Sequence, residues 1–195
     1  MKLQVEDLKF ESATFRTPLK FGASVCKGMI MPVVSVRLTD GAREGIGAGA
    51  MPLGNAWAFP AAPHEASLAA MRGLTERMAK AAHGAKADSI FELSHELETT
   101  ASKLANEIAI ESMGLPGPIP KLCALVVFSL FDIGAFDAWG KMHRANTFAL
   151  LRSTPEGDDL SRWLDSSFHA FGLKQTLRSA PKPSLPLFHL VGGLD

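Results

Sequence analysis

The stretch 120–141 constrains the fold most strongly, because it is long and apolar. Apolar side chains recur there at steps of two to four residues, so they cover most of a helix of about six turns. A membrane span needs roughly 18 or more apolar residues, whereas the apolar run 122–130 is soon followed by Asp132 and Asp137. We therefore expect a buried helix in a protein that does not enter a membrane.

The two aspartates of this helix need hydrogen-bond donors if they are buried. Lys141 follows Asp137 by four residues, which is the spacing of an acid-base pair on one helix face. We expect both Asp132 and Asp137 to be structural clamps.

Composition indicates an ordinary globular protein of 195 residues, with 47% hydrophobic and 21% charged residues. Twenty basic residues balance twenty acidic ones, and no Lys/Arg block is dense enough to follow a phosphate backbone, so nucleic acid is not expected as a partner. Acidic residues interrupt the first ten positions, which excludes a signal peptide there and predicts a cytoplasmic location. Cys26 and Cys123 are far apart and are expected to be free thiols.

The first fifty residues predict three antiparallel strands. The first covers 2–14 and is expected to be interrupted by Pro18, and the second covers 25–38 and ends in a tight turn at 39–41. The third covers 44–50 and is rich in glycine. Its glycine run lacks the spacing and the Lys of a phosphate-binding loop, so we do not assign it to a nucleotide.

The stretch 51–63 is predicted to be a long loop, with three prolines and the aromatic residues Trp57 and Phe59. Two interpretations stay open for it. The aromatic side chains are exposed and form a contact surface, or Trp57 plugs the core of the domain itself.

Helices are predicted at 66–83 and from a cap at Asp88 as far as 113, and together with the strands they indicate an α+β domain in which a helical bundle follows the meander. Glu92 and His95 share one helix face, which is compatible with a metal ligand pair. A di-iron site would need that pair again on a second helix, and no repeat occurs, so a solvated acidic face is the interpretation we favour.

The pattern weakens after residue 141. A short amphipathic helix is expected at 160–173, with Trp163, Leu164, Phe168 and Phe171 turned inward. A Pro-rich linker follows, and the apolar run 187–191 has the composition of a buried strand. Such a strand needs neighbours, so we expect the sequence to stop as a second domain begins.

The run 131–141, F-D-I-G-A-F-D-A-W-G-K, resembles the D-x-A-x-x-D-A-x-G-K segment of the mandelate racemase and muconate-lactonizing branch of the enolase superfamily. There the segment is the last helix of the N-terminal capping domain, and Gly134 stands where the pattern usually has Ala. The R-T-P run at 16–18 and the strand ending in Asp40-Gly41 also resemble that family. Ala48 replaces the acidic residue of its G-x-G-E pattern.

The resemblance implies an enolase-like capping domain at 1–151, an insertion and linker at 152–186, and the start of a truncated (β/α) barrel at 187–195. In the family, two loops of the capping domain close over the active site of the barrel and select the substrate. Carried over by position, the loop residues are Pro18, Leu19, Lys20, Phe21, Gly22, Met51, Leu53, Asn55, Trp57 and Phe59.

The resemblance also implies the chemistry, in which a racemase, cycloisomerase or dehydratase abstracts a proton α to the carboxylate of a small-molecule substrate with the help of a divalent metal. Mg²⁺ is expected in the full-length parent and is not expected to bind this chain, because the catalytic and metal residues belong to the barrel. The chain alone is therefore expected to be inactive, and a homo-oligomer remains possible.

Two further functions stay open. The chain is a stand-alone interaction module that kept the cap and lost the barrel, or it is an unrelated helical ligand-binding domain. The second alternative requires that the first fifty residues do not form a sheet.

Overall fold

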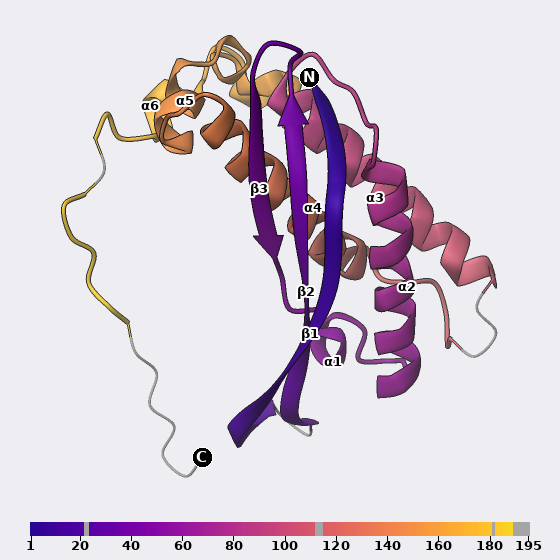
Figure 1. Ribbon diagram of the computed structural model, residues 1–195. Helices are drawn as coiled ribbons and strands as arrows, with labels where there is room; N and C mark the ends of the chain where they lie inside the picture. Colours follow the sequence, from indigo (N-terminus) through magenta and orange to yellow (C-terminus); the bar gives the residue numbers. More distant parts are fainter. Residues whose placement is uncertain (22–23, 112–114, 181, 189–195) are drawn as a thin grey trace.

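A three-stranded antiparallel sheet precedes a set of helices in the computed structural model, which describes residues 1–21, 24–111, 115–180 and 182–188 (Figure 1). The strands are β1 (Lys2–Phe21), β2 (Ser24–Thr39) and β3 (Glu44–Ala50), in the order β1-β2-β3. The α+β class and the three-stranded meander are thereby confirmed. A purely helical domain is excluded, because the first fifty residues form the sheet.

β1 continues past the point where the sequence predicted its end, so that prediction is wrong. Thr14 pairs with Gly28 and the next pair is Leu19 with Cys26, which places residues 15–18 opposite the single residue 27. Pro18 has no N–H to donate and is tolerated in this irregularity of the register. The strand is long because β2 pairs with it on both sides of the irregularity.

Asp40 organises the turn between β2 and β3, where the sequence predicted a tight turn at 39–41. Its carboxylate accepts hydrogen bonds from the backbone N–H groups of Arg43 and Ala42 at 2.8 and 3.0 Å, and from the Arg43 guanidinium at 2.6 Å. The backbone hydrogen bond of Arg43, then its side chain and then Ala42 lower the pKa of Asp40 to about 2.

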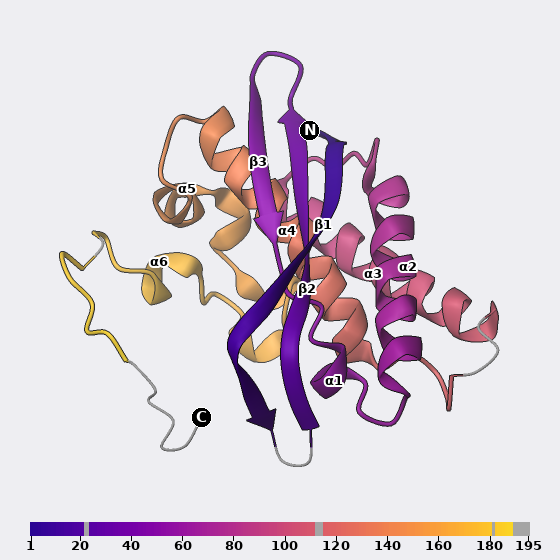
Figure 2. The same ribbon diagram turned by 60° about the horizontal axis from the view of Figure 1, so that its bottom comes forward.

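The helices gather on one face of the sheet, and Figure 2 shows the other face open in the described part of the chain. They are α1 (Asn55–Ala58), α2 (His64–Ala82), α3 (Ile90–Glu111), α4 (Lys121–Met142), α5 (Thr147–Ser153) and α6 (Leu173–Thr176). α4 contacts β2, β3, α2 and α3, so it is the element that the others share. The cap of α3 differs from the prediction, because the Ser89 hydroxyl, and not Asp88, accepts the Glu92 N–H at 3.2 Å.

α4 has the length and composition of a membrane-spanning helix, with a mean hydropathy of 1.8 over its most apolar window. Of that window, 56% is buried inside the fold. The core helix of a folded domain meets the same criteria, and the cytoplasmic location stays a prediction.

The glycines of β3 allow α4 to approach the strand closely. A Cβ at Gly47 would lie 2.1 Å from the carbonyl oxygen of Gly134, and one at Gly49 would lie 1.9 Å from that of Leu130. Any side chain at these positions would collide with the helix backbone. The glycine run therefore serves helix-strand packing, a role that its sequence pattern did not reveal.

Asp137 is the clamp that the sequence predicted. Its Oδ2 accepts the backbone N–H of Ala48 in β3 at 2.9 Å and the Nζ of Lys141 at 2.7 Å. Ala48 lies on an edge strand, whose free N–H groups otherwise invite pairing with another chain. The aspartate and lysine of the D-A-W-G-K run thus fasten α4 to the sheet edge.

The segment after α5 folds in short 3₁₀ turns, η1 (Pro155–Gly157), η2 (Leu160–Arg162) and η3 (Ser166–Phe168), and the predicted helix at 160–173 is wrong. Trp163 does turn inward and stacks on Phe91 of α3, with ring centroids 5.5 Å apart. Leu164 and Phe171 are 60% and 40% exposed, contrary to expectation, because isolated turns do not keep one helical face.

Residues 182–188 are extended, and the prediction of a buried strand fails at Leu187 and Phe188, which are 98% and 91% exposed. The rest of that predicted strand, 189–191, lies outside the described residues.

Candidate functional site

The first predicted specificity segment lies on an arm of the sheet. β3 ends at Ala50, which pairs with Val33, so β1 and β2 continue beyond it as a two-stranded hairpin. We call residues 13–21 and 24–29 of this hairpin the arm (Figures 1 and 2). Pro18, Leu19 and Lys20 are exposed on it, Phe21 ends β1, and Gly22 lies outside the described residues.

The second predicted segment returns to the base of the arm. The N–H of Met51 donates to the carbonyl of Pro32 at 3.4 Å, and that of Leu53 donates to the carbonyl of Ile30 at 3.0 Å. α1 follows directly and lies beside the base of the arm in both views. Two segments thirty residues apart in sequence thus share one end of the sheet.

The side chains of the second segment divide into two kinds. Trp57 is 55% exposed, whereas Leu53, Asn55 and Phe59 are buried. The expectation that Phe59 is exposed is wrong, because this ring belongs to the core of the domain. The alternative that Trp57 plugs the core is also wrong, because this side chain is exposed.

Local backbone geometry holds Trp57 in its exposed position. Gly54 has a φ of +56°, and a Cβ there would lie 2.4 Å from the indole Nε1 of Trp57, so the ring lies over the glycine. The buried Asn55 donates through its side-chain amide to the Ser67 hydroxyl at 2.9 Å and to the His64 carbonyl at 3.0 Å. Asn55 therefore ties α1 to the start of α2 and is a structural residue.

The arm is positively charged. No Asp or Glu occurs between Glu11 and Asp40, whereas Arg16, Lys20 and Lys27 lie within that stretch. All three are exposed, and none of them forms an ion pair with a described residue. An uncompensated cluster of this kind raises the local concentration of anions.

The register places Lys20 and Lys27 on the same side of the arm. Lys20 pairs with Val25 and Leu19 pairs with Cys26, and paired residues point to the same face of a sheet. Lys27 is two residues from Val25 and shares the face of Lys20. The arm therefore has one cationic face and one face that carries Leu19 and the free thiol of Cys26.

The metal interpretation of Glu92 and His95 finds no support in the described ranges, where no group of three or more His, Cys, Asp or Glu side chains could hold a metal ion. Glu92 forms an ion pair with Arg162, and the imidazole of His95 lies edge-on to Trp163 with centroids 6.4 Å apart. Both side chains help to hold the segment that contains Trp163.

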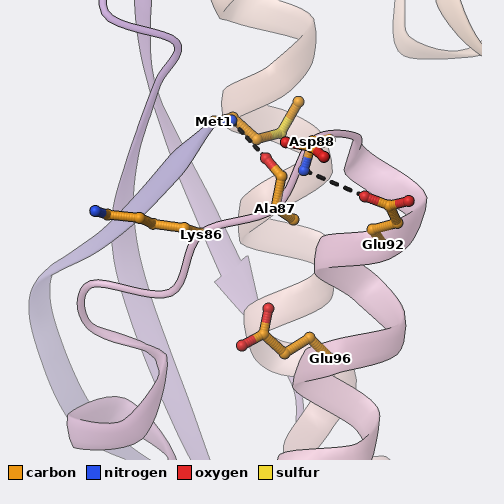
Figure 3. A pocket seen from close by; sticks show the side chains of 6 residues that line it. All are labelled: Met1, Lys86, Ala87, Asp88, Glu92 and Glu96. Atoms are coloured by element: carbon orange, nitrogen blue, oxygen red, sulfur yellow. Dashed lines mark hydrogen bonds between the residues drawn. The ribbon is translucent and has the colours of Figure 1, made fainter.

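Sequence reasoning missed a polar pocket at the opposite end of β1 from the arm. Its volume is about 430 Å³, and Figure 3 shows its lining of Met1, Lys86, Ala87, Asp88, Glu92 and Glu96. The i, i+4 spacing of the three acidic residues is the signal that could have indicated it. The terminal amine of Met1 donates to the Ala87 carbonyl at 2.5 Å.

Comparison with protein-family models, with curated proteins and with solved structures gave no match for this chain.

Proposed function

We propose that the chain is the substrate-specificity cap of an enolase-superfamily enzyme of the mandelate racemase and muconate-lactonizing type. The resemblance of the 131–141 run suggests the family, and the enolase N-terminal-domain-like fold is part of the same proposal. The cap would close over a barrel that abstracts a proton α to a carboxylate.

One observation carries the proposal. The arm and the 51–59 segment lie at the same end of the sheet, and in the described part of the chain no helix covers the arm. Loops at one end of a rigid body are where proteins place ligand contacts. Trp57 and the cations of the arm offer an aromatic surface and positive charge, which suit a small carboxylate substrate.

The Mg²⁺ that such an enzyme uses would stabilise the enediolate on the barrel. The described residues of this chain contain no group of three or more His, Cys, Asp or Glu side chains that could hold a metal ion. In this proposal the part of this chain is to bind and enclose the substrate. Catalytic residues are assigned to the barrel and none to this chain.

The experiment is to sequence the gene beyond the codon for Asp195 and to assay the longest polypeptide in frame. We expect a K-x-K motif, spaced acidic residues at strand ends, and turnover of a carboxylate that chelation abolishes and added Mg²⁺ restores. Trp57→Ala in that polypeptide should change the ranking of substrates. If the polypeptide binds magnesium but turns over nothing in a broad panel of acid sugars and amino-acid derivatives, the proposed enzymatic function is wrong.

The exposed indole also favours a second candidate, a stand-alone interaction module. Trp and Arg are the residues most enriched among energetic anchors of protein interfaces, and Trp57 and Arg16 lie at the same end of the molecule. This function predicts that the 195-residue chain is monodisperse and cooperatively folded in sedimentation and thermal melting. Aggregation at micromolar concentration would argue against it.

A further inference from the structure

Asp132 is a second acidic residue of α4, one and a half turns before Asp137, and its environment is different. It is half-buried where α4 packs on α3. Its Oδ1 is the only buried side-chain nitrogen or oxygen of the described residues that has no hydrogen-bond partner. A buried carboxylate oxygen without a donor is costly, because an ionised oxygen loses its hydration and gains nothing in return.

The groups around Asp132 do not supply a compensating charge. Desolvation by burial raises the pKa of Asp132, the Ser94 side chain opposes this by favouring the ionised form, and the negative charge of Glu98 raises the pKa further. Glu98 forms an ion pair with Lys121, whose Nζ lies 4.0 Å from the Glu98 carboxylate. No basic side chain of the described residues forms an ion pair with Asp132.

We propose that Asp132 keeps its proton in the folded chain and that loss of this proton loosens the contact between α3 and α4, which makes this helix pair a pH-sensitive latch. The neutral acid can donate a hydrogen bond and carries no charge toward Glu98. The ionised acid leaves a charge without a counterion between two packed helices.

The latch would act on the segment that follows α5. α3 presents Phe91, which stacks on Trp163 and meets the ring of Phe136 edge-on at 6.5 Å. Phe136 lies one turn after Asp132 on α4, so the aromatic contacts and the carboxyl group share one interface. A shift of α3 would therefore disturb the contact that holds Trp163, and the segment 155–171 would become less protected.

The direction of the pH effect follows from linkage. An unfolded chain titrates Asp132 near its ordinary pKa of 3.8, and the folded chain titrates it at higher pH. Between those two values the folded chain binds more protons, so this group makes the fold most stable on the acidic side and less stable as pH rises through the raised pKa. Asp137, whose pKa is lowered, has the opposite dependence and serves as an internal reference.

The direct test is the carboxyl ¹³C NMR titration of the aspartates in the whole chain. We expect the Asp132 signal to titrate at clearly higher pH than every exposed aspartate, with Asp137 at the low end. Titration of Asp132 together with the exposed aspartates near pH 4 overturns the proposal, and this readout does not depend on any variant being folded.

Three variants separate a titrating latch from a simple packing role. Asp132→Asn should melt at a higher temperature than the native chain at pH 8 and at nearly the same temperature at pH 4.5, with a gap of about 3 °C at the higher pH. Ser94→Ala should move the Asp132 titration to higher pH and Glu98→Gln should move it to lower pH. Parallel melting curves for Asp132→Asn, or shifts of the same sign for the other two, would refute the latch.

Discussion

The two ends of the β1-β2 hairpin have the same strands but opposite surroundings. At the body end, β3 and α4 cover the hairpin, and backbone approaches backbone so closely that Gly47 and Gly49 admit no side chain. At the arm end, two strands run on alone with three cations that form no ion pair with a described residue. The difference teaches that one continuous strand can be both a packing element and a largely uncovered arm, because its neighbours and not its own propensity decide the role.

The two ends of the hairpin also differ in how their charged side chains are paired. Arg37 at the body end forms ion pairs with Glu6 and Glu44 at 2.8 and 2.9 Å, whereas Lys20 and Lys27 on the arm have no such partner among the residues that the structure describes. Exposed ion pairs contribute little to stability, so each of these pairs is expected to add at most about 1 kcal/mol.

The largest loss of stability is expected at the contact between β3 and α4, where the two backbones lie closest. Gly47→Val would drive a side chain into the carbonyl of Gly134 and should lower the free energy of unfolding by more than about 3 kcal/mol. Chemical denaturation measures this. The control is Gly73→Ala in the middle of α2, where a Cβ meets nothing within 4 Å and should stabilise the helix by about 0.5–1 kcal/mol. Equal effects at the two glycines would show that close packing is not the reason for the β3 glycines.

The next largest loss of stability is expected for one of the two aromatic residues of the 51–59 segment and not for the other. Phe59→Ala removes a ring that is 3% exposed and should cost about 3 kcal/mol, whereas Trp57→Ala removes one that is 55% exposed and should cost less than about 1 kcal/mol. Thermal melting of both variants measures the two losses of stability. A larger loss for Trp57→Ala would place the indole in the core and withdraw it from ligand binding.

A smaller effect is expected at the clamp that fastens α4 to β3. Burial alone would raise the pKa of Asp137, but Lys141 and the Ala48 N–H outweigh it and lower the pKa. The clamp is therefore fully present above the ordinary pKa of 3.8 and is lost as pH falls through the lowered one. Asp137→Asn should cost about 0.5–1 kcal/mol at pH 7, a value reduced for the exposure of the pair. At pH 2.5 the cost should be smaller, and a constant cost would show that ionisation is irrelevant.

The smallest effect is expected on the arm. Val25→Ser changes a side chain that is 53% exposed on the arm, so the unfolding free energy should change by less than about 0.5 kcal/mol. Limited proteolysis should cut the arm before the body, because an isolated two-stranded hairpin is only marginally stable in water. Cleavage first within α4 or β3 would reverse the contrast drawn between the two ends.

Much of the fold could be predicted from local patterns. The bounds of α4 lie within one residue of the stretch 120–141, and β2 and β3 begin and end where alternation and the Asp40 turn indicate. The pairing of Asp137 with Lys141 followed from their spacing. These features depend on residues that are near one another in the chain, and the sequence displays such relations directly.

Other features could not be predicted, because they depend on contacts between distant residues. Pro18 stays within β1 only because β2 supplies a partner on each side of the irregularity. Trp57 and Phe59 are two residues apart in a stretch predicted to be a loop, in which α1 forms, and nothing in their order says which of them faces the core. The single exposed turns after α5 likewise replaced a helix that periodicity favoured.

The sequence by itself determined the class of the fold and the place of the central helix. Only the tertiary structure decided that the arm and α1 share one end of the sheet, that the β3 glycines serve backbone approach, and that Asp132 and Asp137 have opposite pKa shifts. The physical reason is that periodicity reports which face of an element is apolar, whereas burial, close approach and charge compensation depend on the atoms that other elements bring to that face.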